Sequence, residues 1–195
     1  MRNLCDALLT RPVLIPSPAL SSSLISHRII GRTKITAVTI FLWLTMPLAL
    51  LWTQQAIAGD ATNTCIAESA QFHYVNPWIL AGILKVESSF NPKAVNRNKN
   101  GSVDVGIGQM NSIHFRELSR WGIEPNDLFD ACTGIYVAAW HLSKQLKAHG
   151  NTWYAIGAYH SATPYYNQRY QALVYNALVS MRAAPGPKLR VPPMR

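Results

Sequence analysis

The sequence predicts a single, mainly helical domain with at most a short β element, and three observations lead to this prediction. Apolar residues recur at helical spacing in residues 77–87 and again in residues 131–148. Between these segments lies a polar, glycine-containing stretch, 100–108, where we expect the short β element. The 195 residues, 49% of them hydrophobic, are enough for one domain with a real core.

The first 58 residues are predicted to be a leader and signal peptide. Residues 1–27 are rich in proline, serine and leucine and carry no helical or strand period. A basic segment, 28–34, then precedes an apolar run at 35–52 and a small-residue cleavage pattern at 56–58. An uncleaved inner-membrane anchor is the alternative reading, and it would be the chain's sole contact with a membrane. Both readings place the remaining chain in the periplasm.

The charge of the chain is concentrated in part in this leader. Five basic residues stand against one acid in the first 58, a net +4, so +5 of the formal +9 belongs to the rest. This excess suits an anionic polymer as a partner. Nucleic acid is not predicted as a partner, because no basic patch is interleaved with aromatic residues.

Two cysteines remain once Cys5 is assigned to the leader. Cys65 and Cys132 form an even pair in a chain predicted to be exported, so we expect a disulfide between them. Two separate buried thiols are the alternative.

Residues 59–182 are expected to form the domain, and the proline-rich basic residues 183–195 a disordered tail. Within the domain, an asparagine and a threonine precede the first helical pattern, and Asn76-Pro77 is a helix-start signal. Hydrophobic spacing predicts helices at 66–74, 77–87, 112–120, 131–148, 153–159 and 167–181, and a single turn at 125–129.

Glu87 is the candidate catalytic residue, because it continues the apolar stripe of the predicted helix. It falls at i+7 from Leu80, on the face that Ile83 and Leu84 share. Burial disfavours the charged form of a carboxylate, and the negative end of the helix dipole acts in the same direction, so both raise its pKa. A carboxylic acid that is protonated near neutral pH can act as a general acid. The alternative is a glutamate that ends its helix at the surface.

The residues after Glu87 favour a binding cleft. Residues 88–92 break the helix, and Gly101, Gly106 and Gly108 lead into residues 109–111. Glycines let a backbone approach a ligand closely, and glutamine and asparagine offer donors and acceptors suited to sugar hydroxyls and amides.

Three separated motifs resemble those of the lytic transglycosylases with a soluble-lysozyme-like (SLT) domain. They are Glu87-Ser88-x-Phe90-Asn91-Pro92-x-Ala94, Gly106-Ile107-Gly108-Gln109 and Ala158-Tyr159-His160. The resemblance covers roughly Thr64 to Ala177 and is greatest to the small specialised enzymes of type III and type IV secretion, conjugation and pilus systems. It implies a goose-type-lysozyme-like fold.

The resemblance also implies the roles of individual residues. Glu87 becomes the sole catalytic acid and base, and Tyr159 hydrogen-bonds near it. The implied substrate-binding residues are Ser88, Gln109, Met110, Asn111, Tyr159 and His160. The chain departs from the family pattern where Ile107-Gly108 replaces Leu-Met and where His160 replaces asparagine.

The implied reaction is non-hydrolytic cleavage between N-acetylmuramic acid and N-acetylglucosamine, which gives a 1,6-anhydro product without any cofactor. Asp104 is expected to fix its loop instead of taking part in catalysis. No metal is predicted, because Asn96-x-Asn98-x-Asn100-Gly101 lacks the charge of a calcium loop. The alternatives are a hydrolytic lysozyme that uses Asp104, and a peptidoglycan-binding assembly factor with little catalysis.

Overall fold

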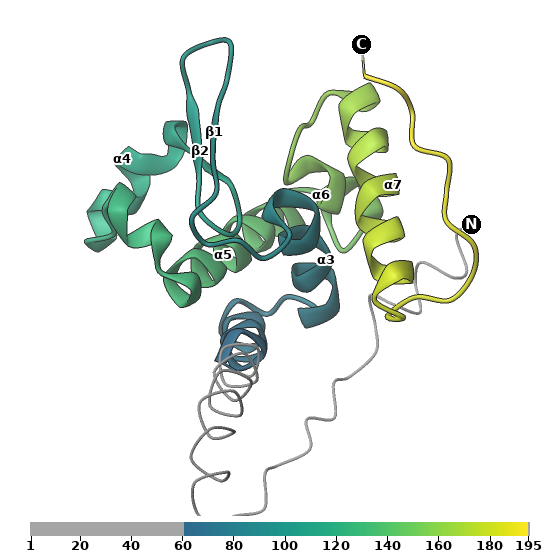
Figure 1. The fold of residues 1–195 in the computed structure, drawn as a ribbon, viewed down its shortest axis with the longest axis horizontal. Helices are drawn as coiled ribbons and strands as arrows, with labels where there is room; N and C mark the ends of the chain where they lie inside the picture. The colour runs from purple at the N-terminus through teal and green to yellow at the C-terminus, as the bar shows by residue number, and fades with distance from the viewer. Residues whose placement is uncertain (1–60, 195) are drawn as a thin grey trace, which may run out of the picture. The chain divides into compact units, whose positions relative to one another are not determined.

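The computed structural model describes residues 61–194, so the predicted leader and signal peptide at 1–58 lie outside the described residues. Helical residues 61–73 come first and are followed by the four main helices (Figure 1). These are α3 (Pro77–Ser88), α5 (Ala131–His149), α6 (Trp153–Ala158) and α7 (Pro164–Ser180). The mainly helical architecture that the sequence predicts is confirmed. None of the helices between residues 61 and 194 is both long and apolar enough to cross a membrane.

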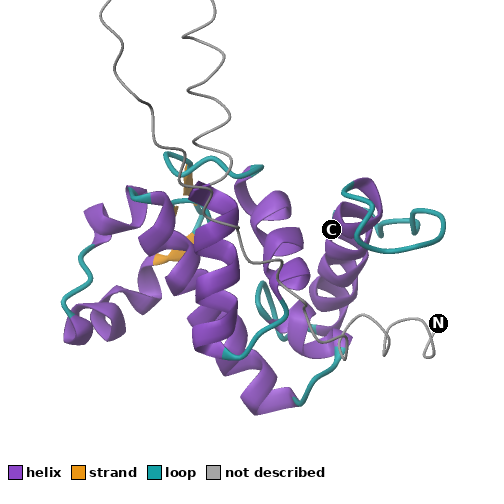
Figure 2. Ribbon diagram, turned by 90° about the horizontal axis from the view of Figure 1, so that it is seen from below, coloured by secondary structure: helices purple, strands orange, loops and turns teal. Residues whose placement is uncertain are grey.

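The β element is a small antiparallel sheet beside the helices (Figure 2). Its strands are β1 (Val95–Arg97), β2 (Val103–Val105) and β3 (Met110–Asn111), in that order. The β1–β2 hairpin turns at Gly101, whose φ of 82° favours glycine. Valines suit the flanking strands. The sheet begins five residues before the stretch where the sequence places it.

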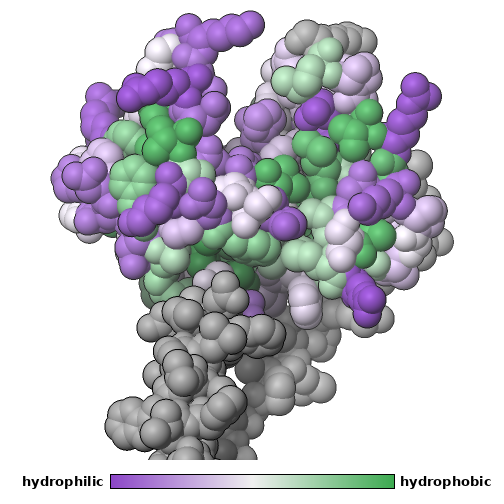
Figure 3. Space-filling model, in the orientation of Figure 1, coloured by the Kyte–Doolittle hydropathy of each residue, from purple (hydrophilic) through white to green (hydrophobic). Residues whose placement is uncertain are grey.

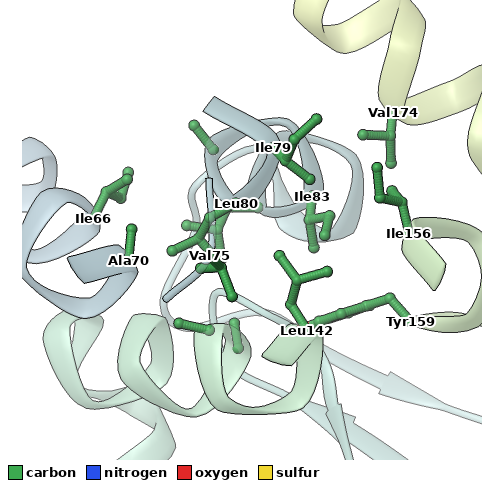
Figure 4. Close-up of a cluster of buried hydrophobic side chains, with 14 of the residues drawn as sticks. Ile66, Ala70, Val75, Ile79, Leu80, Ile83, Leu142, Ile156, Tyr159 and Val174 are labelled. Atoms are coloured by element: carbon green, nitrogen blue, oxygen red, sulfur yellow. The ribbon is translucent and has the colours of Figure 1, made fainter. Parts of the chain in front are cut away.

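The core is built around α3. Leu80, Ile83 and Leu84 are fully buried and face α5, α6 and α7, and Figure 4 shows two of them among side chains of those helices. Gly82 lets α7 come close, since a Cβ at this position would lie 3.1 Å from the Leu178 side chain. This close packing fixes the position of the last turn of α3 relative to α7.

A second, smaller core lies beneath the sheet. It contains Val105, Met110, Leu118, Leu128 and Val137, so it joins the strands to α5. The loop that links β2 to β3 is part of this packing, because its glycine at 106 has a φ of 79° and comes too close to the backbone of η3 (Pro125–Phe129) to carry a side chain.

The segment predicted as one helix at 112–120 is instead three short turns. They are η1 (Ser112–His114), α4 (Phe115–Leu118) and η2 (Ser119–Trp121). The apolar residues of this segment predict that Ile113 and Leu118 face inward, whereas 73% of the Ile113 side chain is exposed. Leu118 does pack inward, and Phe115 packs with it in place of Ile113. Their i, i+3 spacing needs only a tight turn, so no long helix forms here.

The predicted disulfide is present. Cys65, in the first helix, is bonded to Cys132, in the first turn of α5, and the two lie 67 residues apart in the sequence. The bond holds the N-terminal helix against α5.

The C-terminal segment differs from the predicted disordered tail at 183–195. After α7 the described residues run back along that helix (Figure 1). Tyr175 donates a hydrogen bond to the carbonyl of Pro185 (2.7 Å). Asn176 pairs with both backbone groups of Leu189, at 2.9 and 2.7 Å. Side chains of α7 thus form hydrogen bonds with backbone groups of this segment, whose prolines prevent it from forming a helix.

Candidate active site

Glu87 lies in the last turn of α3. The helix starts where the sequence predicts, because the Asn76 side chain accepts hydrogen bonds from the amides of Trp78 (2.9 Å) and Ile79 (3.2 Å). It ends at Ser89, which adopts a left-handed conformation with a φ of 54°. Glu87 is therefore held on a rigid, capped helix and is half-buried.

The Glu87 carboxylate accepts a hydrogen bond from the hydroxyl of Tyr170 on α7. Tyr170 is only 3% exposed. Its ring stacks with those of Tyr159 and His160, with centroids 6.3 and 5.1 Å away. This stack fixes the tyrosine that holds the acid.

Burial raises the pKa of the Glu87 carboxyl to about 7. The Tyr170 hydrogen bond opposes this shift, because it stabilises the charged form, and the negative charge of Asp104 adds to it. The raised pKa agrees with the argument from the apolar stripe. Glu87 can therefore hold its proton near neutral pH, as a general acid must.

Glu87 opens onto a polar cleft of about 670 Å³. One wall is the β1–β2 hairpin and the other is formed by residues around Tyr159, and Figure 3 shows the surface hollowed between these two parts. The predicted binding residues Gln109, Met110, Asn111, Tyr159 and His160 all line it. The side chains that the sequence did not assign to binding are Asn96, Asn98, Asn100, Ser102, Ile113, His114, His141 and Met194.

Asp104 also lines this cleft, where three amides hold its carboxylate. Asn111 donates to one oxygen at 2.6 Å, and Asn98 and Asn96 donate to the other at 2.9 and 3.2 Å. These bonds tie the three strands of the sheet together. The arrangement agrees with the expectation that Asp104 fixes its loop.

Ser88 and Gln109 hold the loop that precedes the cleft. The Ser88 hydroxyl donates to the carbonyl of Ile107 (2.7 Å), and Ser88 is not among the residues that line the cleft. The Gln109 amide donates to the carbonyls of Ala94 (3.2 Å) and Gly106 (2.9 Å). Ser88 thus joins the end of α3 to this loop, and its contact with substrate stays a prediction.

Tyr159 does not bond to the acid directly. Its hydroxyl donates to the carbonyl of Gly108 (2.8 Å), while its own carbonyl lies 3.1 Å from Nε2 of His141. Burial lowers the pKa of His141 to about 4, so this imidazole is neutral near pH 7. Tyr159 therefore fixes the cleft loop through Gly108, and its ring stacks on Tyr170, the residue that bonds to Glu87.

Tyr170 is the site residue that the sequence argument missed. Its position carries a signal, since Tyr170, Val174 and Leu178 fall at i, i+4 and i+8 and all three are buried. A tyrosine on a buried helical stripe must find a hydrogen-bond partner for its hydroxyl. The pattern could thus have indicated a buried partner such as Glu87.

A smaller hollow of about 200 Å³ adjoins the cleft at Glu87. It is lined by Val86, Glu87, His160, Tyr166, Arg169, Tyr170, Leu173 and Met194. Glu87, His160 and Met194 border both spaces. The candidate acid therefore stands where two hollows meet, as a group that acts on the middle of an extended ligand would.

These features define a class of protein: a lysozyme-like helical domain with one desolvated carboxylic acid at the end of a buried helix, facing a cleft lined by amides. Residues 64–176 match the Transglycosylase SLT domain family, and the chain belongs to this family. Membership confirms the lysozyme-like fold that the resemblance implies.

Three relatives give the extent of the similarity. The chain is 34% identical over 106 residues to invasion protein IagB of Salmonella typhimurium, a match covering 54% of this chain and 66% of that protein. It is 32% identical over 135 residues to the X polypeptide of Escherichia coli K12, covering 66% and 79%. It is 34% identical over 100 residues to protein IpgF of Shigella flexneri, covering 51% and 66%. The chain thus spans just under two thirds of IagB and IpgF.

Proposed function

We propose that this protein is a peptidoglycan lytic transglycosylase in which Glu87 is the catalytic acid and base. The observation that carries the proposal is a carboxyl with a pKa of about 7, held by Tyr170 where two hollows meet. Membership of the transglycosylase family supports it. The acid is on a rigid helix and its neighbours are fixed, so its geometry is preorganised.

The reaction needs only one acid. Protonated Glu87 gives its proton to the glycosidic oxygen between N-acetylmuramic acid and N-acetylglucosamine, and the bond from that oxygen to C1 breaks. The substrate's own N-acetyl group stabilises the positive centre that forms at C1. The Glu87 carboxylate then takes the proton of the muramic C6 hydroxyl, whose oxygen bonds to C1. The product is a 1,6-anhydro sugar, no water is consumed, and Glu87 is protonated again.

The distribution of carboxylates supports a one-acid mechanism. Glycosidases that use two acids need a second carboxylate placed for attack or for water activation. Among the described residues, Asp104 is the other acid that lines the cleft, and three amides occupy it. Asp104 therefore stabilises the cleft wall through these hydrogen bonds, and its charge helps to keep Glu87 protonated.

The proposed place of action is the periplasm, where the enzyme locally opens the wall for a secretion, conjugation or pilus apparatus. The signal-like pattern of residues 28–58 supports export. The disulfide suits an oxidising compartment. Similarity to a protein named for invasion, and to the small specialised transglycosylases, supports the link to such an apparatus.

The decisive test is mass spectrometry of the products that the protein releases from purified peptidoglycan. We expect anhydro-muropeptides from the unaltered protein and none from Glu87→Gln. Glu124→Gln is the matched control, because this exposed acid does not line the cleft, and it should retain turnover. Glu87→Gln should still bind peptidoglycan.

Each other outcome selects an alternative. Reducing muropeptides would identify a hydrolytic lysozyme, for which the position of Asp104 in the same cleft is the favourable observation. Binding without release by the unaltered protein would favour an assembly factor. Turnover by Glu87→Gln equal to that of the unaltered protein would remove Glu87 from its role.

A further inference from the structure

Arg169 is a charged residue of the smaller hollow that the proposed reaction does not use. It lies on α7, next to Tyr170, and shares the hollow with Glu87, His160 and Met194. A guanidinium stays protonated at any physiological pH, so this hollow permanently holds a positive charge.

Arg169 lacks a counter-charge within residues 61–194. Its Nε atom is buried and has no hydrogen-bond partner there, and the ion pair found among these residues joins Lys144 to Glu117. Glu87 does not serve as its partner, because Tyr170 bonds to that carboxylate and the pKa of Glu87 is raised, not lowered. A buried donor without a partner is costly unless a ligand satisfies it.

The walls of the hollow strengthen the effect of this charge. Val86, Leu173 and Met194 give the hollow an apolar lining beside the guanidinium. Burial lowers the pKa of His160, the charge of Asp104 raises it, and the charge of Arg169 lowers it further, so the guanidinium acts on the imidazole of the same hollow. A cation in such surroundings binds an anion more strongly than one on an open surface.

We propose that Arg169 binds a carboxylate carried by the muramic acid residue beside the scissile bond. This inference rests on the proposed function. In peptidoglycan, carboxylates belong to the muramic acid residues, as the lactyl group of a bare strand or in the peptide attached to it, whereas N-acetylglucosamine has none. Arginine suits the role because its planar donors match a carboxylate with two hydrogen bonds.

The consequence is that Arg169 sets the register of the glycan strand. It selects the muramic sugar for the hollow on its side of Glu87, so the acid meets the bond that follows muramic acid and not the one that follows N-acetylglucosamine. Arg169 is then a specificity-determining residue, whereas Glu87 performs the chemistry.

The test measures binding in the full chain that carries Glu87→Gln, so that it does not depend on turnover. The three probes are intact glycan strands with peptides, strands stripped of peptides by an amidase, and oligomers of N-acetylglucosamine. Adding Arg169→Gln should weaken binding of a muramic-containing probe about tenfold, the loss of one charge-assisted contact. Binding of the oligomers should stay the same.

Two further variants guard against an indirect effect. Arg116→Gln removes an equal charge from the exposed surface of α4 and should leave the preference among probes unchanged. Arg169→Lys keeps the charge but loses the paired donors, so it should weaken binding of the muramic probes less than Arg169→Gln does. Thermal melting of each variant confirms that the domain is folded.

The pattern of losses identifies the carboxylate. Weaker binding of the stripped strands alone indicates the free lactyl carboxylate, and weaker binding of the intact strands alone indicates a carboxylate of the attached peptide. Weaker binding of both indicates that Arg169 reaches either one. Equal loss with all three probes, or loss with none, would overturn the inference. A hydrolytic product pattern would overturn the proposed function instead and leave this binding preference standing.

Discussion

Glu87 is tuned by opposing contacts, and each can be altered by itself. Burial raises its pKa to about 7, the Tyr170 hydroxyl lowers it, and the charge of Asp104 raises it. Neither neighbour has another role in the proposed chemistry. Their removal should therefore move the pH dependence of turnover in opposite directions.

Tyr170→Phe should shift the pH profile upward. The substitution keeps the ring but removes the hydrogen bond that stabilises the carboxylate, so the pKa of Glu87 rises. The alkaline limb of kcat/KM, which reports loss of the proton, should move up by about one pH unit. A limb that stays in place would show that the hydrogen bond does not control the acid.

Asp104→Asn should shift the same limb downward. The side chain keeps its size, but the negative charge that favours protonated Glu87 is lost, and the pKa of Glu87 falls. Asn96→Asp serves as the comparison, because it adds a carboxylate to the same hairpin and should move the limb upward. A common shift of both profiles would point to altered hairpin structure in place of charge.

Glu87 should also make the protein less stable as pH rises. Its folded pKa of about 7 exceeds the ordinary value of 4.5, so the folded state holds its proton longer than the unfolded state. The contribution of Glu87 to the unfolding free energy therefore falls as the pH rises from 4.5 to about 7, and it is constant above about 7. At pH about 8, Glu87→Gln should raise the unfolding free energy by about 1–3 kcal/mol, measured by denaturant titration. Near pH 4 the gain should vanish, and a gain of equal size there would contradict this account.

At the scale of elements, α3 is the part that the sequence described best. Its start at Asn76-Pro77 and its buried stripe both follow from local rules of capping and periodicity, and the structure has both. The same local rules gave a wrong prediction for the segment at 112–120, which is three short turns and not one helix. Ile113 lines the cleft and is exposed, so an apolar residue in this segment does not identify a core position.

The disulfide makes a prediction at this scale. Replacing Cys65, Cys132 or both by alanine should cost about 4 kcal/mol of unfolding free energy in each case, because the closed loop constrains the unfolded chain. Equilibrium unfolding in urea, with and without reductant, measures it. The unaltered protein should show no free thiol from this pair after denaturation, and additive losses in the two single variants would contradict a shared bond.

The whole molecule places a polar cleft between its hairpin and its helical part (Figure 3). The chain beyond residue 58 carries a net charge of +5, which suits a wall polymer with free carboxylates. Raising the ionic strength should weaken binding to intact peptidoglycan, because charges more than about 10 Å apart are screened at 0.1 M salt. Sedimentation with purified walls measures this, and N-acetylglucosamine oligomers, which are uncharged, should bind equally at all salt concentrations.

The sequence by itself determined the helical fold, the disulfide partners, the family and the candidate acid. Each depends on a pattern that the sequence itself displays: an apolar stripe that ends in a glutamate, an even number of cysteines, or short motifs in a fixed order. Only the tertiary structure decided which tyrosine holds Glu87, that Ser88 faces the loop, and that residues 183–194 lie along α7. These outcomes depend on contacts between distant segments, because Tyr170 reaches Glu87 across 83 residues of sequence, and local spacing carries no information about such distances.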